Sequence, residues 1–418
     1  MGAADVKLNR GGVMGAQFDT ARHETLADIP WNAGAAHGAL ERIVDETRAA
    51  FTPNGLWPIH PRDADGGSHP RTSLWEGAAG VIWGLDHLAR ERAASPGPSF
   101  SEHLPEVQRR NRRVLESDGW RKALGDAWQT RSWLFGDSGV LFTRWTAASD
   151  EAVLEALAEN IALNSNDPAL ELMWGAPGTM LAALALYRSS GDARWVDLYR
   201  EGARALEAAF TFDEALGADL WTQTLYGRSA QYLGPVHGFA GNAFALFEGR
   251  DLLAPEVWAS LSKRIARTVR TTAIPGPAGV NWGPLIGWEG IGKILVQHCH
   301  GAPGMVNAMA GLDEPIEDLL IGGGDLTWNA GPLAKGANLC HGTAGNGLAF
   351  LKLFVRTGDE LWLDRARSFA MHAIAQSDAE AADVGHRRFS LWTGDIGLAC
   401  YLWECLNQTA RFPTMDVL

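Results

Sequence analysis

Three consecutive segments of the chain place cysteine and histidine residues directly before a glycine pair, in a pattern that suits metal binding and proton transfer. His237 stands in PVHGFAG, Cys299 and His300 stand in QHCHGAPG, and Cys340 and His341 stand in NLCHGTAGNG. Two thiolates and one imidazole form a ligand set that suits Zn²⁺, and three protein ligands leave a coordination position open for a substrate. Either His300 or His341 can complete this set, and the pattern alone favours neither.

Other polar residues near the glycine pairs have two interpretations each. His237 has no neighbouring cysteine, so it suits a general acid/base better than a ligand, although a hydrogen-bonded core histidine is the alternative. Glu171, just before Trp174-Gly175, can present a carboxylate to the same cavity or serve as a solvated or capping residue. Asp395 in TGDIG is expected to cap its helix. Cys400 and Cys405 lie in an apolar helix with no histidine nearby, which favours buried packing.

These residues occupy matching places in an internal repeat, a Gly-x-x-Gly pair followed by an apolar helical run. The copies are WEGAAGVIWGL (75–85), FGDSGVLFTRW (135–145), WGAPGTMLAAL (174–184), HGFAGNAFALF (237–247), HGAPGMVNAMA (300–310), HGTAGNGLAFL (341–351) and TGDIGLACYLW (393–403). Glycines permit tight turns and a close approach of backbones where such helices begin. We expect the helix starts to gather at one end and to leave unpaired N–H groups facing a shared cavity.

Amphipathic helices are predicted between the copies. Apolar residues recur at helical spacing in 39–51, 150–163, 193–210, 257–272 and 359–376. Each unit therefore pairs a polar-faced outer helix with an apolar inner helix, which predicts an all-α protein, a double-layered α/α barrel of seven helical hairpins. Strand-like alternation is scarce, with RFSLW (388–392) the best example, and 92–104 and 272–288 are expected to be loops. No linker divides the chain, so residues 1–418 are expected to form one domain.

Composition excludes several classes of protein. The chain has 418 residues, 46% of them apolar, which is enough for a large core. Its 49 acidic and 36 basic residues give a net charge of −13, a poor match for nucleic acid. Four cysteines do not form a disulfide framework in a chain this long, which indicates a reducing compartment. No signal peptide stands in residues 1–30, and no apolar run reaches the ~20 residues that span a bilayer, so we expect a cytoplasmic protein without integral membrane association.

The motifs VHGFAG (236–241), CHGAPG (299–304) and LCHGTAGN (339–346) resemble, in this order, the signatures of the lanthionine synthetase C-like family. The seven repeats extend the resemblance over most of the chain from about Ser73 onward, whereas the first ~70 residues match weakly. The histidine after Cys299, together with GDSG (136–139), FSLW (389–392) and ARFP (410–413), is similar to the eukaryotic LanC-like branch.

The resemblance implies a set of site residues. It implies one zinc ion held by Cys299, Cys340 and His341, with His237 as the catalytic acid/base. It also implies an acidic catalytic residue at Glu171, and substrate contacts from Lys335 to a glutathione carboxylate and from Arg388. His298 stands where relatives often carry tryptophan, which leaves the ligands intact and changes their surroundings.

The activity implied is the zinc-dependent addition of glutathione, or another small thiol, to dehydroalanine or dehydrobutyrine residues in a peptide or protein. A lanthipeptide cyclase, in which the thiol belongs to the same peptide, is the first alternative. A non-catalytic regulatory protein that binds glutathione or zinc is the second, although a scaffold has no need of an open metal position. An α/α-barrel glycosidase with paired carboxylates leaves both Cys-His-Gly motifs unexplained.

Overall fold

The structure is a computed structural model that describes residues 17–64, 69–288 and 294–418. We expected no signal peptide in residues 1–30, and the first 16 of these residues lie outside the described part of the chain. In the described ranges, no helix combines the length and apolarity that a membrane span requires.

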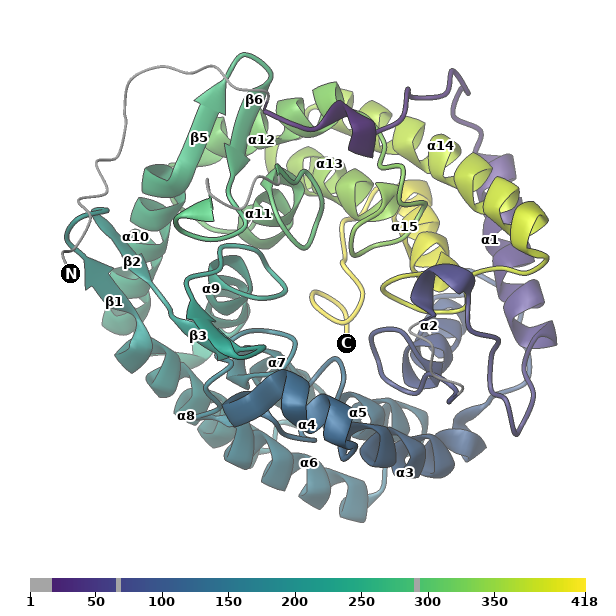
Figure 1. The fold of residues 1–418 in the computed structure, drawn as a ribbon, viewed down its shortest axis with the longest axis horizontal. Helices are drawn as coiled ribbons and strands as arrows, with labels where there is room; N and C mark the ends of the chain where they lie inside the picture. Colours follow the sequence, from purple (N-terminus) through teal and green to yellow (C-terminus); the bar gives the residue numbers. More distant parts are fainter. Residues whose placement is uncertain (1–16, 65–68, 289–293) are drawn as a thin grey trace.

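Seven inner helices form a ring, and seven outer helices surround it (Figure 1). The inner helices are α2 (Ala78–Arg90), α5 (Asp137–Ala147), α7 (Ala176–Ser190), α9 (Phe239–Glu248), α11 (Ala302–Met309), α13 (Thr343–Thr357) and α15 (Asp395–Asn407). The outer helices are α1 (Ala33–Ala49), α3 (Leu104–Leu115), α6 (Glu151–Asn164), α8 (Ala193–Ala209), α10 (Pro255–Thr272), α12 (Glu317–Ala330) and α14 (Glu360–Val384). Helix α1 packs on α15 and thereby joins the end of the ring to its beginning. The predicted double-layered α/α barrel is confirmed.

The glycine pairs have a steric cause that is shared by all seven repeats. The first glycine of each pair is the N-cap of an inner helix. A Cβ on the second glycine would lie only 1.8–2.3 Å from the carbonyl oxygen six residues earlier, as at Gly345 against Leu339 and at Gly80 against Leu74. Each inner helix thus lies directly against its own preceding loop, and a side chain at the second position would separate the two.

The expectation that the inner helices leave unpaired N–H groups is wrong at six of the seven helix starts, since the first N–H of α11, at Ala302, donates to Asn281 Oδ1 (2.9 Å) and five others donate to their own preceding loops. The first helical N–H of α2, α5, α9, α13 and α15 donates to the carbonyl oxygen seven residues earlier, for example Thr343 N to Gly336 O at 3.0 Å. The loop that the glycines hold close therefore satisfies these donors. Asp395 does not cap α15 through its side chain, because its carboxylate accepts instead from Ser377 Oγ (2.7 Å) and from the backbone N–H of Arg388 (3.0 Å).

The predicted outer helices are confirmed with altered ends, and two were missed. Helix α14 runs eight residues beyond the predicted end at 376, to Val384. Helices α3 and α12 were not predicted. Helix α12 contains Gly322, Gly323 and Gly324, which weaken its helical pattern. A Cβ on Gly324 would lie 2.3 Å from the side chain of Leu353, so these glycines allow α12 to pack closely on α13.

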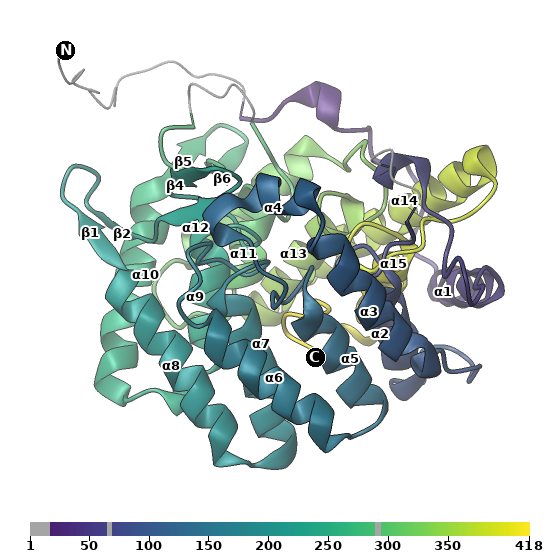
Figure 2. The ribbon, with the colours of Figure 1, turned by 60° about the horizontal axis from the view of Figure 1, so that its bottom comes forward.

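Three short antiparallel hairpins and one short helix complete the described chain. The strands are β1 (Thr211–Asp213) with β2 (Ala218–Leu220), β3 (Gln223–Leu225) with β4 (Arg228–Ala230), and β5 (Ala273–Gly276) with β6 (Gly279–Trp282). The segment 272–288, expected to be a loop, therefore contains a hairpin, and RFSLW (388–392) is not a strand. Helix α4 (Asp118–Leu124) and the β5–β6 hairpin lie at the same end of the barrel (Figure 2).

The C-terminal segment fills the middle of the ring, where Figure 1 shows it enclosed by the inner helices. Phe412 and Met415 are buried there, and the backbone carbonyl of Thr414 accepts a hydrogen bond from Trp133 Nε1 at 3.2 Å. Lys352 of α13 pairs with Asp416. The barrel interior is thus a packed core, with space for a ligand only toward its ends.

Candidate functional site

A continuous series of backbone hydrogen bonds links equivalent residues of six neighbouring repeats at the end where the inner helices begin. Each of these residues stands two positions before the first glycine of its pair. The bonds run from Cys299 N to Cys340 O (3.0 Å), Cys340 N to Trp392 O (2.9 Å), Trp392 N to Trp75 O (3.0 Å), Trp75 N to Leu134 O (3.0 Å) and Leu134 N to Met173 O (3.2 Å). These five bonds connect six of the seven repeats, and the bond from Trp392 to Trp75 joins the seventh repeat to the first. Two cysteines at the same place in consecutive repeats are therefore held side by side.

The ligand cluster consists of Cys299, Cys340 and His341, whose donor atoms all lie within 4.8 Å of one another. Both cysteines are buried, and His341 is partly exposed. His300, the alternative ligand, is not part of this group; its ring faces His237 with the centroids 6.3 Å apart. Of the two histidines that the sequence left open, the geometry groups His341 with the thiols.

Polar neighbours hold this cluster in place. The side-chain amide of Gln297 donates to Cys299 Sγ at 2.9 Å, and Asn338 Oδ1 accepts from the backbone N–H of His341 at 3.0 Å. Gln297 was not predicted as a site residue, although it lies within the quoted QHCHGAPG motif.

The two thiols fit a divalent cation. The pKa of Cys299 lies well below its ordinary value because the thiolate accepts hydrogen bonds from Cys340 and from His341. The pKa of Cys340 is raised, first by burial and then by the neighbouring Cys299. Without a cation the first thiolate thus opposes ionisation of the second, and a dication that binds both removes this conflict. Two sulfurs and one imidazole nitrogen are a donor set typical of Zn²⁺.

His237 and Glu171, predicted as catalytic residues, form a pair. Glu171 is fully buried, and its Oε2 lies 3.0 Å from Nδ1 of His237, whose side chain is 19% exposed. The carboxylate also accepts from the backbone N–H groups of Met173 (3.1 Å) and Trp174 (2.6 Å). These two bonds fix the carboxylate, which in turn orients the imidazole and leaves its Nε2 free for proton transfer.

Aromatic side chains form a stacked wall next to this pair. Trp392 stacks on Trp75 with ring centroids 4.7 Å apart, and Phe135 stacks on Trp174 at 5.1 Å. Trp75 and Phe135 join the two stacks at 6.2 Å. These rings, which recur beside the glycine pairs, therefore pack against one another across four repeats and help to fix the helix start next to Glu171.

His298 lies beneath the ligand cluster and is fully buried. Its ring stacks on Phe412 of the C-terminal segment with centroids 4.1 Å apart, and its Nδ1 lies 3.1 Å from the amide of Asn307. Burial lowers the pKa of His298 to about 3, so the ring is neutral at physiological pH. It serves as a flat packing group between the segment that carries Cys299 and the C-terminal residues.

The two predicted substrate-binding residues have different environments. Lys335 is exposed on the loop before Cys340, and it is close enough for its charge to oppose the protonation of His300. Arg388 is only 6% exposed and is paired through two nitrogens with Asp63 of the N-terminal segment. Lys335 is therefore accessible to a ligand, whereas Arg388 already forms an ion pair with Asp63.

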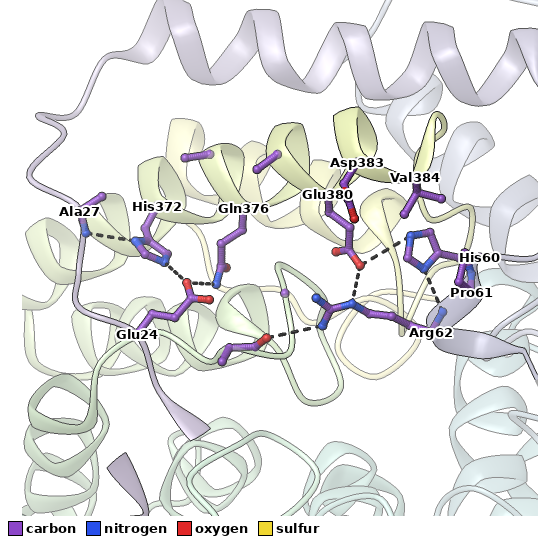
Figure 3. Close-up of a pocket in the computed structure, with 14 residues that line it drawn as sticks. Glu24, Ala27, His60, Pro61, Arg62, His372, Gln376, Glu380, Asp383 and Val384 are labelled. Carbon is purple, nitrogen blue, oxygen red and sulfur yellow. Dashed lines mark hydrogen bonds and ion pairs between the residues drawn. The ribbon is translucent and has the colours of Figure 1, made fainter. Parts of the chain in front are cut away.

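A groove of about 600 Å³ runs between α14 and the loop that leads to the ligand cluster (Figure 3). At one end Glu24 accepts from His372 (3.0 Å) and from Gln376 (2.8 Å), and at the other Arg62 pairs with Glu380 (2.6 Å). Ala334 and Gly336 line its side, so Lys335 stands at its edge, while Cys299, Cys340 and His341 do not line it. The groove and the ligand cluster thus lie along one loop.

The closed ring of seven helical pairs, with a Cys₂His cluster where the inner helices begin, defines an α/α-barrel protein with a candidate metal site. Residues 219–417 match the family model of lanthionine synthetase C-like proteins. Glutathione S-transferase LANCL1 of Danio rerio is 31% identical over 194 residues, which are 45% of this chain and 46% of that relative. LanC-like protein GCL1 of Arabidopsis thaliana is 31% identical over 134 residues, which are 29% of this chain and 30% of that relative.

The chain thus aligns with less than half the length of these two curated relatives. Nisin cyclase superposes on it with a TM-score of 0.54 at 13% identity, over 89% of this chain and 94% of that one, which shows a shared fold. The resemblance seen in the motifs is thus confirmed over residues 219–417, which match the lanthionine synthetase C-like family model, and the shared fold extends over most of the chain.

Proposed function

We propose that the protein is a zinc-dependent enzyme that adds a small thiol such as glutathione to dehydroalanine or dehydrobutyrine residues of a peptide or protein. The observation that carries the proposal is the cluster of Cys299, Cys340 and His341 next to the His237–Glu171 pair. The names of the relatives, a glutathione S-transferase and a cyclase, support an enzymatic role in general. The proposal treats residues 1–418 as one domain and places it in the cytoplasm, where thiols stay reduced.

In this proposal Cys299, Cys340 and His341 hold one zinc ion. A bound zinc ion supplies positive charge that lowers the pKa of a thiol at its open position.

The chain's own groups then handle the protons. The substrate sulfur forms a bond to the β-carbon, and the electron pair of the double bond moves onto the carbonyl oxygen as an enolate. His237 delivers a proton from Nε2 to the α-carbon and completes the thioether. Glu171 keeps the Nδ1 proton of the imidazole in place and stabilises the imidazolium that exists before this transfer.

Lys335 is proposed to bind a carboxylate of glutathione. Its exposure on the loop before Cys340 supports this role, and its ammonium forms no ion pair within the described ranges. Arg388 is paired with Asp63, so it can bind the substrate only if the substrate replaces Asp63 as its partner. We propose a substrate contact for Arg388 on that condition.

The test incubates zinc-loaded protein with glutathione and a dehydroalanine peptide and measures the thioether by mass spectrometry. We expect an adduct with the wild-type chain and none with Cys340→Ala, together with loss of stoichiometric zinc. Cys405→Ala is the matched control, since Cys405 is buried in α15 outside the ligand cluster, and it should keep both zinc and turnover.

Other outcomes distinguish the alternatives. A precursor peptide that carries both the dehydroalanine and an internal cysteine should give a ring without glutathione if the protein is a lanthipeptide cyclase. Stoichiometric zinc without either product would favour the non-catalytic binding protein. Full turnover in Cys340→Ala would contradict the proposed chemistry.

A further inference from the structure

The hairpin β3–β4 extends one side chain toward the His237–Glu171 pair. Its two-residue turn consists of Tyr226 and Gly227, with φ of 54° and 73°. Both values lie in the left-handed region, as a type I′ turn requires. The first position of this turn usually holds asparagine, aspartate or glycine, and a tyrosine there stores backbone strain that must be offset by contacts elsewhere.

The hairpin is fastened to the segments that carry both members of the pair. Thr224 N donates to Pro168 O at 2.8 Å, and Gln223 Nε2 donates to Leu170 O at 3.4 Å, directly before Glu171. Gln223 Oε1 accepts from the backbone N–H of Tyr232 at 2.9 Å, on the segment that leads to His237. The tip of the hairpin is therefore fixed relative to the third and fourth repeats.

The ring of Tyr226 lies against the pair at the tip of the hairpin. It meets the imidazole of His237 edge to face, with centroids 5.8 Å apart and an interplanar angle of 83°. Trp174 Nε1 donates to its hydroxyl at 3.0 Å, which occupies one lone pair. Among the described residues the phenolic hydrogen has no acceptor, and 42% of the residue is exposed, so a substrate can take that hydrogen bond.

Although 42% of the residue is exposed, its hydroxyl lies against Trp174, and burial of the phenol, followed by the nearby charge of Glu171, raises the pKa of Tyr226. The side chain therefore remains a neutral phenol, which donates a hydrogen bond and does not carry a charge of its own.

We propose that Tyr226 is a catalytic residue that donates a hydrogen bond to the carbonyl oxygen of the dehydroamino acid as the enolate forms. The inference rests on the proposed function. The α-carbon that His237 protonates and the enolate oxygen are only about 2.4 Å apart, as two bonds through the carbonyl carbon dictate. Donors to these two atoms must come from adjacent side chains, and Tyr226 is in contact with His237.

The electrons and protons of this step balance without a further reactant, because His237 takes the thiol proton on Nε2 when the thiol binds and later gives it to the α-carbon. The sulfur–carbon bond forms at the β-carbon while the double-bond pair moves onto the oxygen that Tyr226 contacts. When His237 protonates the α-carbon, the carbonyl re-forms and the oxygen loses its excess charge. Tyr226 keeps its proton throughout, and its hydrogen bond is strongest in the transition state, where it lowers the barrier.

The test compares Tyr226→Phe with the wild-type protein in thioether formation. Loss of a single oxyanion donor costs on the order of 100-fold in kcat. We expect a fall of this size with an unchanged KM for the thiol and unchanged zinc content. Tyr187→Phe, on α7, is the matched control and should retain wild-type turnover.

A second variant separates donation from folding, because Tyr226→Phe also removes the acceptor of the buried Trp174 N–H. Replacing Tyr226 with 3-fluorotyrosine keeps that acceptor and strengthens the donor, so kcat should equal or exceed that of the wild type. Its fluorine resonance should also shift when a peptide carbonyl binds.

The outcomes separate the inference from the proposed function. If wild-type protein forms no thioether, the proposed function fails. If it does, and Tyr226→Phe works within twofold of the wild type or the fluorotyrosine variant loses as much as the phenylalanine variant, the role of Tyr226 is overturned.

Discussion

The contact between Glu171 and His237 leads to the sharpest prediction, for the substitution Glu171→Gln. The buried carboxylate accepts three hydrogen bonds, from the N–H groups of Met173 and Trp174 and from Nδ1 of His237. Oε1 accepts from Trp174 N–H, whereas Oε2 accepts both from Met173 N–H and from Nδ1 of His237. An amide keeps only one oxygen, and if that oxygen stays with Trp174, the NH₂ group replaces Oε2 and Met173 N–H loses its acceptor. This NH₂ group then faces Nδ1 of His237, which becomes an acceptor, so that the ring proton moves to Nε2 and the charge that stabilises the imidazolium is lost.

The magnitude follows from the kind of bond that is removed. A hydrogen bond to a charged group contributes about 1.5–3 kcal/mol, and this range corresponds to a fall in kcat of roughly 10- to 150-fold. Glu171→Ala is less informative, since it leaves the N–H groups of Met173 and Trp174 buried without an acceptor and costs about 1–3 kcal/mol of stability for each.

The assay is steady-state thioether formation with glutathione and a dehydroalanine peptide, on protein of measured zinc content. Asp167→Asn is the matched control: it changes a buried carboxylate of the same loop whose oxygen accepts from Ala169 N at 2.9 Å and makes no contact with His237 among the described bonds. We expect a lower kcat for Glu171→Gln with an unchanged KM for the thiol, and wild-type values for Asp167→Asn. A folded, zinc-loaded Glu171→Gln protein with kcat within threefold of the wild type would refute the assignment of His237 as an acid held by Glu171.

Two further predictions concern charged groups near the site. The substitution Arg388→Met breaks the buried pair with Asp63 and should lower the free energy of unfolding by about 3–5 kcal/mol. Adding Asp63→Asn in a double variant should lower it little further. A raised KM for glutathione at full stability would instead show that Arg388 binds the substrate. Burial raises the pKa of Asp395 from 3.8 to about 6, so its carboxyl group stays protonated up to a higher pH in the folded state than in the unfolded state. The free energy of unfolding should therefore fall by about 2 kcal/mol between pH 4 and pH 6 on account of this group. Urea titrations should find that fall reduced in Asp395→Asn, and an identical pH dependence in both proteins would contradict the argument.

Much of the barrel could be predicted because its signals are local. A glycine pair at every inner-helix start and an apolar run after it follow from sterics within a few residues, as at Gly345 against Leu339 O. The prediction of secondary structure failed where packing between repeats outweighs the local preference of the residues. RFSLW is buried at all five positions, and Trp392 forms only single backbone bonds with Trp75 and Cys340, so no strand forms. Helix α12 contains three glycines because it packs closely on α13, where a side chain at Gly324 would collide with Leu353.

Tyr226 was missed for a related reason. Its signal was a tyrosine-glycine pair between two short polar-apolar runs, QTL and RSA, which is weak evidence for a hairpin on its own. Only the anchors on Pro168, Leu170 and Tyr232 hold the turn in its strained geometry and bring the phenol to His237.

The sequence by itself determined the chemistry available to this protein: two thiols and several imidazoles, each at the start of an apolar helix, in a chain too acidic for nucleic acid. The tertiary structure decided which of these groups meet. His341 joins the thiols while His300 turns toward His237, and Glu171 reaches His237 across 66 residues of chain. The physical reason is closure of the ring, since backbone bonds between equivalent residues of neighbouring repeats fix a register that is invisible within any one repeat.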